Sequence, residues 1–186
     1  DLIVVNNTKV MPARVPGRTR STGKVLDLLF VQDLGQGVWE VLIKGRFRPG
    51  ALIDFPDGGC GEIVERSQAR TALKVTGVTS VYDLMHATGT MPLPPYIKRE
   101  PSEEDQQWYQ TMFAQQEGAI AAPTAGLHFT RELVKALTAK GIELAQVTLH
   151  VGPGTFRSVK SDRIEEHRML AEQVEVTVHT VEQIRL

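Results

Sequence analysis

The sequence has very little cysteine and no strong excess of charge of one sign. Its 186 residues include a single cysteine, Cys60, and carry a formal net charge of −1. One cysteine excludes an intrachain disulfide and is typical of a reducing compartment, so we expect a cytoplasmic protein. A nearly neutral total excludes a uniformly basic nucleic-acid binder, although a local basic patch is still compatible with it.

Long apolar runs are also missing. No run approaches the roughly 20 residues that a transmembrane helix needs. The first five residues, Asp1–Val5, have no basic leader and resemble a strand already under way. We therefore expect no membrane partner, and a chain that begins inside a larger fold. What remains, 41% hydrophobic and 23% charged residues, is typical of a globular protein.

Residues 24–76 have a different residue pattern from the rest of the chain. Five short β-prone runs alternate there with turn residues, at Lys24–Val31, Val38–Lys44, Ala51–Phe55, Glu62–Glu65 and Thr71–Val75. With no helix among them, this spacing predicts a small antiparallel sandwich or barrel. We assign this β domain to residues 16–90, with a short helix near its end at 81–88.

The flanking segments, residues 1–15 and 91–186, alternate helix and strand. After the proline-rich boundary Met91–Ile97, helices are predicted from Ser102 through Phe113, at Arg131–Lys140 and at 164–170. Strands are predicted at Gly118–Ala122, Ile142–Leu149 and Gln173–Val178. Such alternation predicts an α/β core of βα units around a mostly parallel sheet or barrel. We expect this core, incomplete at both ends, to carry the β domain as an insertion.

Two loops follow strands of this core and carry histidines. The first contains His128, and the second begins with His150 and continues into the glycine turn Gly152–Gly154. If the two strands are parallel neighbours, both loops emerge at one edge of the sheet, where α/β folds bind ligands. Histidine can serve as an acid or a base near neutral pH. We therefore predict a cleft with both histidines on its walls.

The same sequence offers two further candidates, a metal site and a polyanion site. His167 adds a third histidine, next to Glu166, but separations of 22 and 17 residues match no compact ligand motif, so we expect no metal. The first 26 residues contain five basic side chains and one acidic one, and Lys98 with Arg99 lies beyond the insert. These charges are either simply solvated or line a groove for a polyanion.

Four longer motifs carry a resemblance to a known family. They are Asp1–Arg14 (DLIVVNNTKVMPAR), Met91–Ile97 (MPLPPYI), Ala121–Phe129 (AAPTAGLHF) and Val147–Phe156 (VTLHVGPGTF). In order and approximate spacing, they resemble the S-adenosylmethionine:tRNA ribosyltransferase-isomerase family of queuosine synthesis. The resemblance covers nearly the whole chain and is weak only in the β insert.

The resemblance implies a transferase-isomerase of tRNA modification. Such an enzyme moves the ribosyl part of S-adenosylmethionine to a 7-aminomethyl-7-deazaguanine base in a tRNA anticodon and yields epoxyqueuosine, adenine and methionine. S-adenosylmethionine is then a substrate and no cofactor is expected; the partners are this substrate and the tRNA anticodon stem-loop, and we expect a monomer. The implied fold is an α/β core with an inserted small β-barrel.

The resemblance also assigns roles to residues. His128 and His150 are expected to share the proton transfers, with Glu166 and His167 as second-rank candidates. The S-adenosylmethionine pocket is expected to be shaped by Thr124, Gly126, Gly152, Gly154 and Thr155. Contacts to tRNA are expected from Arg14, Arg18 and Lys98. Two alternatives stay open: a truncated or diverged tRNA-binding module without activity, and a metal-dependent hydrolase that uses the three histidines.

Overall fold

The computed structural model of the chain describes residues 1–67, 70–156, 161–166 and 171–185. The chain divides into two compact units, Met11–Pro92 and Asp1–Val10 with Leu93–Leu186. We expected boundaries after residues 15 and 90. The observed division lies five residues earlier at the first boundary, because the strand that begins at Arg14 belongs to the barrel, and two residues later at the second.

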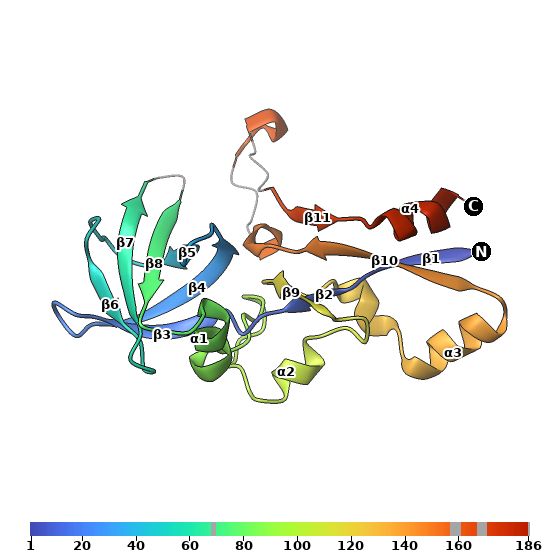
Figure 1. Cartoon of the computed structure of the whole chain (residues 1–186), viewed down its shortest axis with the longest axis horizontal. Coiled ribbons are helices and arrows are strands. Elements are labelled where there is room, and N and C mark those ends of the chain that lie inside the picture. Colours follow the sequence, from blue (N-terminus) through green and yellow to red (C-terminus); the bar gives the residue numbers. More distant parts are fainter. Residues whose placement is uncertain (68–69, 157–160, 167–170, 186) are drawn as a thin grey trace. The chain divides into compact units, whose positions relative to one another are not determined.

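The Met11–Pro92 unit is built around a closed antiparallel barrel of six strands (Figure 1). In barrel order the strands are β3 (Arg14–Thr19), β4 (Val25–Asp33), β5 (Val38–Ile43), β8 (Thr71–Thr76), β7 (Cys60–Arg66) and β6 (Leu52–Asp54). The predicted antiparallel barrel is confirmed. Its sixth strand, β3, is not among the five predicted runs, and it passes through Pro16. Pro16 is exposed between the buried Val15 and Gly17, so its ring points out of the barrel.

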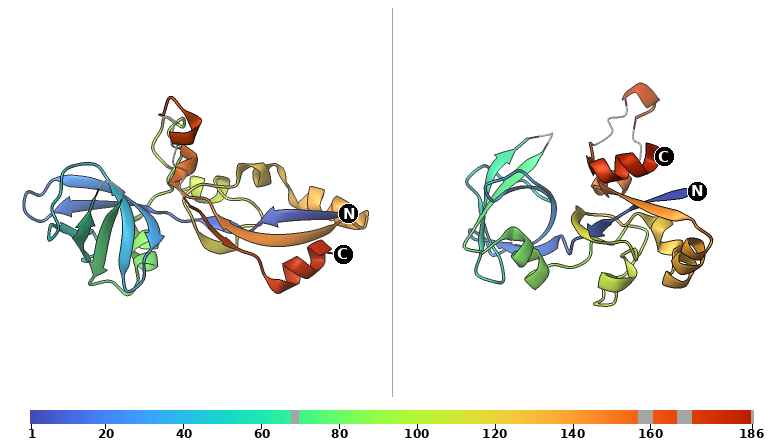
Figure 2. Two further views of the ribbon diagram at one scale, coloured as in Figure 1. Left: turned by 90° about the horizontal axis from the view of Figure 1, so that it is seen from above. Right: turned by 45° about the vertical axis from the view of Figure 1, so that its right-hand side comes forward.

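The barrel encloses its own hydrophobic core, around which its strands close in both views of Figure 2. Leu28, Phe30, Ile53, Ile63 and Leu73 are fully buried. Burial of each such side chain contributes about 1.5–3 kcal/mol to stability. The core is closely packed: a Cβ added at Gly17 would lie 2.8 Å from Cγ2 of Ile53.

The two ends of the barrel unit meet beside helix α1 (Val81–Thr88). Ser80 begins this helix by accepting a hydrogen bond from the Asp83 amide at 3.0 Å. Just after it, the backbones of Arg14 and Thr90 exchange two hydrogen bonds, of 3.2 and 2.9 Å. A Cβ at Gly89 would lie 1.9 Å from the Pro12 carbonyl oxygen, so only glycine allows this close approach.

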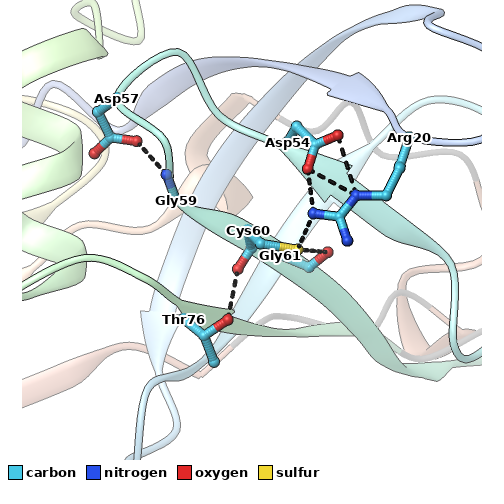
Figure 3. Close-up of polar contacts among 7 residues, drawn as sticks. All are labelled: Arg20, Asp54, Asp57, Gly59, Cys60, Gly61 and Thr76. Atoms are coloured by element: carbon cyan, nitrogen blue, oxygen red, sulfur yellow. Dashed lines mark hydrogen bonds and ion pairs between the residues drawn. The ribbon is translucent and has the colours of Figure 1, made fainter.

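An ion pair links neighbouring strands on the outside of the barrel (Figure 3). Arg20, just after β3, donates from Nε at 3.0 Å and from Nη2 at 2.5 Å to Oδ1 of Asp54, in β6. The hydrogen bond from Arg20 holds the pKa of Asp54 below its usual value. Nη2 also lies 3.2 Å from Cys60 Sγ, in β7. Because both charged side chains are about half exposed, we expect the pair to contribute little to stability.

The other unit contains two short parallel ladders. In the first, β1 (Leu2–Asn6) pairs in parallel with β10 (Glu143–His150), and β11 (Gln173–Glu175) is added antiparallel to β10. In the second, β2 (Thr8–Val10) pairs in parallel with β9 (Gln116–Ala119). Parallel strands joined through a helix agree with the predicted α/β core. These two short ladders support the finer prediction, a mostly parallel sheet or barrel of βα units, only in part.

The helices and short 3-10 turns of this unit follow in chain order. They are α2 (Asp105–Trp108), η1 (Thr124–His128), α3 (Arg131–Ala139), η2 (Pro153–Phe156), η3 (Ile164–Glu166) and α4 (Val178–Arg185). The predicted helix α3 is present: Thr130 Oγ1 accepts a hydrogen bond from the Leu133 amide at 3.1 Å, and Gly141 adopts a φ of +77° after it.

Several predicted elements differ from the structure. The strand expected at Gly118–Ala122 is β9 at Gln116–Ala119, and the helix expected at 164–170 is described only as the 3-10 turn η3, because 167–170 lie outside the described residues. The helix expected through Phe113 stops at Trp108, and the chain beyond it continues in turns that bury Tyr109, Thr111 and Phe113. The strand expected through Val178 stops at Glu175. There Thr177 caps α4 instead, accepting a hydrogen bond from the Thr180 amide at 3.2 Å.

Candidate active site

At Asn6 and Asn7 the chain leaves β1, which pairs with β10, and enters β2, which pairs with β9. The polar centre of the unit lies at this change of partner. The Asn6 side chain donates from Nδ2 to the Leu149 carbonyl at 2.9 Å, while its Oδ1 accepts from the Leu149 amide at 3.1 Å and the Thr8 amide at 3.0 Å. Asn7 Oδ1 accepts from Thr148 Oγ1 at 2.7 Å. These bonds replace ladder hydrogen bonds where the backbone turns away from β10, and they hold Thr8 opposite the end of β10.

His150 is the sequence-predicted site residue with the most defined surroundings. It ends β10 half-buried, and its Nδ1 lies 2.7 Å from Oγ1 of the fully buried Thr8. Burial lowers the pKa of His150, and the nearby negative charge of Glu175 partly opposes this effect. The imidazole is therefore biased towards its neutral form.

Gly118 in β9 makes room for this imidazole ring. A Cβ at position 118 would lie 2.6 Å from both Cε1 and Nδ1 of His150. The φ of Gly118, +153°, is also one that side-chain-bearing residues rarely adopt. Glycine at this position is thus required twice, by the backbone and by the ring.

The two histidine-bearing loops start close together, although their strands share no ladder. The condition that these strands, β9 and β10, are parallel neighbours is not met: β9 pairs with β2, and β10 pairs with β1 and β11. Because the chain changes partner between β1 and β2, β9 and β10 lie in different ladders. Their ends still meet, because the Ile120 and Ala121 amides both donate to the Val151 carbonyl, at 2.8 and 3.2 Å.

The first loop presents His128 to solvent. It forms the turn η1, in which Thr124 and His128 are exposed and Gly126 is partly covered. A Cβ at Gly126 would lie 2.8 Å from Cγ2 of Thr111, so this turn packs closely on the chain beyond α2. Exposure leaves His128 accessible to a substrate and to solvent protons.

The glycine turn of the second loop already holds an anion supplied by the chain. The Gly152 amide donates to Oε1 of Glu172 at 3.1 Å. Gly154 and the exposed Thr155 follow in η2, where Pro153 contributes no amide donor. The backbone at Gly152 can therefore bind a carboxylate.

The remaining predicted site residues come from other segments of the chain. Glu166 is exposed in η3, and His167 lies outside the described residues. Lys98 is exposed in the same unit as His150. The other two predicted cations belong to the barrel unit: Arg14 forms an ion pair with Asp27 at 2.6 Å, and Arg18 Nη1 lies 3.5 Å from the Gly23 carbonyl oxygen.

Four residues of this site were not singled out by the sequence pattern: Thr8, Gly118, Glu172 and Glu175. Thr8 lies in the motif Asp1–Arg14 with no role assigned to it, and Gly118 stands at the start of a predicted strand. A glycine inside a strand pattern signals close approach of another group, and this was the available clue for Gly118. The partners of the Thr8 hydroxyl lie more than 100 residues away, so no local pattern indicates them.

Within the part of the chain that the structure describes, no group of three or more His, Cys, Asp or Glu side chains is placed to hold a metal ion. No helix among the described residues is long and apolar enough to cross a membrane.

Comparison with known proteins places the chain in a family. The family model of the queuosine biosynthesis protein matches residues 1–186. Three relatives are named S-adenosylmethionine:tRNA ribosyltransferase-isomerase. The one from Geotalea uraniireducens is 44% identical, with 91% of this chain and 50% of the relative covered. Those from Sulfurihydrogenibium sp. and Thermodesulfovibrio yellowstonii are 39% and 42% identical, covering 100% and 99% of this chain and 55% and 54% of the relatives.

The chain thus spans about half the length of the curated relatives that it matches. The family match, by contrast, extends over every residue of the chain and so includes both units and both loops. The chain belongs to the queuosine biosynthesis protein family.

Proposed function

We propose that this protein acts in tRNA modification as an S-adenosylmethionine:tRNA ribosyltransferase-isomerase. It would move the ribosyl part of S-adenosylmethionine to 7-aminomethyl-7-deazaguanine in a tRNA anticodon, giving epoxyqueuosine, adenine and methionine. The observation that carries the proposal is the family match across all 186 residues, supported by relatives of that name at 39–44% identity. A single cysteine agrees with action in the cytoplasm.

The proposed reaction requires two kinds of proton transfer. The sulfonium of S-adenosylmethionine acidifies the adjacent C5′ hydrogens, so a positioned base can remove one, and departure of adenine is favoured by a donor. General acid and base steps of this kind are worth about 10²–10⁴-fold each. We assign them to His128 and His150, with Glu166 and His167 in second rank. His128 is accessible and His150 is held in place, and these surroundings suit different parts of the reaction.

The two loops would form the S-adenosylmethionine pocket, through Thr124, Gly126, Gly152, Gly154 and Thr155. The hydrogen bond from the Gly152 amide to Glu172 supports this proposal because the amide of this turn already binds a carboxylate. The methionine carboxylate of the substrate is the group with matching chemistry. It would take the place of Glu172 on this amide.

Contacts to the tRNA anticodon stem-loop would come from Arg14, Arg18 and Lys98. Lys98 and Arg18 are exposed, whereas Arg14 would have to exchange its pairing with Asp27 for a phosphate. Each phosphate contact of this kind steepens the fall of the logarithm of the binding constant with the logarithm of the salt concentration by about 0.7–0.9. We propose that the protein acts as a monomer on this tRNA.

Adenine release tests the proposed function directly. The protein is incubated with S-adenosylmethionine and either unmodified tRNA or tRNA that carries the aminomethyl precursor. Adenine should form only with the precursor. Replacing both His128 and His150 by Ala should abolish release, while His179→Ala, an exposed histidine of α4, serves as the matched control.

Adenine release, together with tRNA binding and metal analysis, separates the alternatives. Binding of tRNA without adenine release from the unaltered chain would contradict the proposed activity and favour a tRNA-binding module. Stoichiometric zinc in the purified protein would favour a metal-dependent hydrolase.

A further inference from the structure

A buried hydroxyl contacts the imidazole of His150. Thr8 is fully buried, and its Oγ1 lies 2.7 Å from His150 Nδ1 and 3.5 Å from the Gln116 carbonyl oxygen. A hydroxyl has one hydrogen to donate. Thr8 can therefore donate to the ring, or it can accept a hydrogen bond from Nδ1–H and donate to Gln116.

The two distances decide between these arrangements. Hydroxyl hydrogen bonds centre near 2.7–2.8 Å. The contact to Nδ1 lies in that range, whereas the contact to the Gln116 carbonyl, at 3.5 Å, is long. If Nδ1 carried the proton, the buried Thr8 hydrogen would be left with this poor acceptor, and an unsatisfied buried donor is costly.

We propose that Thr8 is a positioning residue for His150, whose hydroxyl donates to Nδ1 and so places the proton of the neutral imidazole on Nε2. Gly118 fixes the ring against the backbone of β9, since no Cβ fits between them. The Asn6 side chain fixes Thr8 in turn by accepting its backbone amide. Both the ring and the hydroxyl that contacts it are thus held in place by neighbouring residues.

Charged groups around the ring are compatible with a neutral imidazole. From β11, Glu175 attracts positive charge towards His150. From β2 and β9, Lys9 and Glu117 are bound to each other at 2.8 Å, so their charges largely offset one another. The Nδ1 partner is a hydroxyl and not a carboxylate, and a hydroxyl does not stabilise an imidazolium as a carboxylate would.

This tautomer divides the chemistry between the two histidines, a step that rests on the proposed function. A neutral imidazole with its proton on Nε2 offers a hydrogen-bond donor, so His150 would polarise a substrate atom, such as a nitrogen of the departing adenine. It has no free lone pair with which to remove a C5′ proton. That role would fall to the exposed His128.

Nitrogen-15 NMR of the full chain tests the proposal without any substrate. Histidine is labelled with ¹⁵N, the His150 signals are assigned with His150→Gln, and long-range ¹H–¹⁵N correlations report which ring nitrogen carries the proton. The variants are Thr8→Val, which removes the hydroxyl at nearly constant shape, and Thr8→Ser, which restores it. Thr71→Val, a buried threonine of the barrel, is the matched control.

We expect His150 of the unaltered chain to be protonated at Nε2 and unprotonated at Nδ1 at neutral pH. Thr8→Val should lower the ratio of the two tautomers by about two- to tenfold, Thr8→Ser should recover it, and Thr71→Val should leave it unchanged. A proton on Nδ1 in the unaltered chain would overturn the proposal, and this measurement stands even if Thr8→Val fails to fold. An unchanged ratio in a folded Thr8→Val would overturn it as well.

Adenine release separates this proposal from the proposed function. If positioning by Thr8 matters to the reaction, Thr8→Val should lower the rate of release and Thr8→Ser should restore most of it. If the unaltered chain shows the Nε2–H tautomer but releases no adenine, the proposed function fails while the positioning role stands.

Discussion

At the scale of single residues, the surroundings of His150 depend on two small neighbours, Thr8 and Gly118. The first contacts Nδ1 and the second leaves space for the ring. Both come from segments distant in sequence, and neither has chemistry of its own that suggests a site. Their importance lies in what they hold in place.

Gly118→Ala should displace the His150 ring and destabilise the protein. The added Cβ meets the ring at 2.6 Å, and overpacking of this kind costs about 1–3 kcal/mol in addition to the strain of a positive φ. Gly141→Ala is the control, because Gly141 has a φ of +77° but nothing within 4 Å of an added Cβ. Urea unfolding should show the larger loss for Gly118→Ala. Equal losses would mean that the ring yields without cost.

The pKa of His150 should lie below the ordinary value of 6.5, which NMR titration can measure. Because the folded pKa is lowered, the unfolded chain binds more protons just below pH 6.5. The free energy of unfolding should therefore fall as the pH drops below 6.5 and level off below the folded pKa. Comparison with His150→Gln isolates this contribution. A folded pKa at or above 6.5 would contradict the prediction.

At the scale of elements, local hydrogen bonds were predictable and long-range ones were not. The predicted ranges of α1 and α3 agree with the observed helices, whose first turns are closed locally: Ser80 and Thr130 each bind an amide three residues ahead. Five of the six barrel strands were predicted from turns and alternation, and β3 was not. The end of α2 at Trp108 was not predicted. At the start of this helix, Arg99 binds both carboxylate oxygens of Asp105 at 2.6 Å and holds the pKa of that buried carboxyl well below its usual range, a pairing that helical periodicity does not reveal.

The partner change between β1 and β2 was equally hidden from sequence. Asn6 and Asn7 are ordinary turn residues in a local reading, yet their side chains bind Leu149 and Thr148. The sequence therefore predicted which loops carry the histidines, but not which strands pair beneath them. The roles of the site residues in the reaction stay predictions.

Thr130→Ala should destabilise the protein by about 1 kcal/mol, because the first turn of α3 loses the acceptor of the Leu133 amide. Thr130→Ser keeps the hydroxyl and should cost much less. Urea unfolding of both variants provides the measurement. Equal destabilisation by Ala and Ser would show that the threonine methyl group, and not the cap, is what matters.

At the scale of the whole molecule, the two units differ in how well each buries its own apolar side chains. The barrel unit buries large side chains such as Phe30, Trp39 and Leu73. The other unit leaves several apolar side chains exposed on α4 and around β11: Val174, Val176, Val178 and Ile184. Stability should therefore be unequal, with the barrel as the more stable unit.

Residues 11–92 expressed alone should fold into the barrel and unfold cooperatively, since their core is closed and their ends are joined through Arg14 and Thr90. Circular dichroism during heating and dispersed amide signals in NMR would check this. Absence of a cooperative transition would mean that the barrel needs the rest of the chain. Phe30→Ala, expected to cost about 3–5 kcal/mol, is the variant that should abolish folding of the isolated barrel.

The bridge between Arg14 and Thr90 also has a consequence for chain entropy. Pairing of β2 with β9 closes a loop of 108 residues from Thr8 to Gln116. Once the barrel has folded, its ends are already side by side, and the effective loop shrinks to the few tens of residues outside it. Loop-closure entropy grows with the logarithm of length, so prior folding of the barrel lowers the cost of that pairing by about 1 kcal/mol. An insertion that folds first thus makes the parallel ladder of the other unit easier to form.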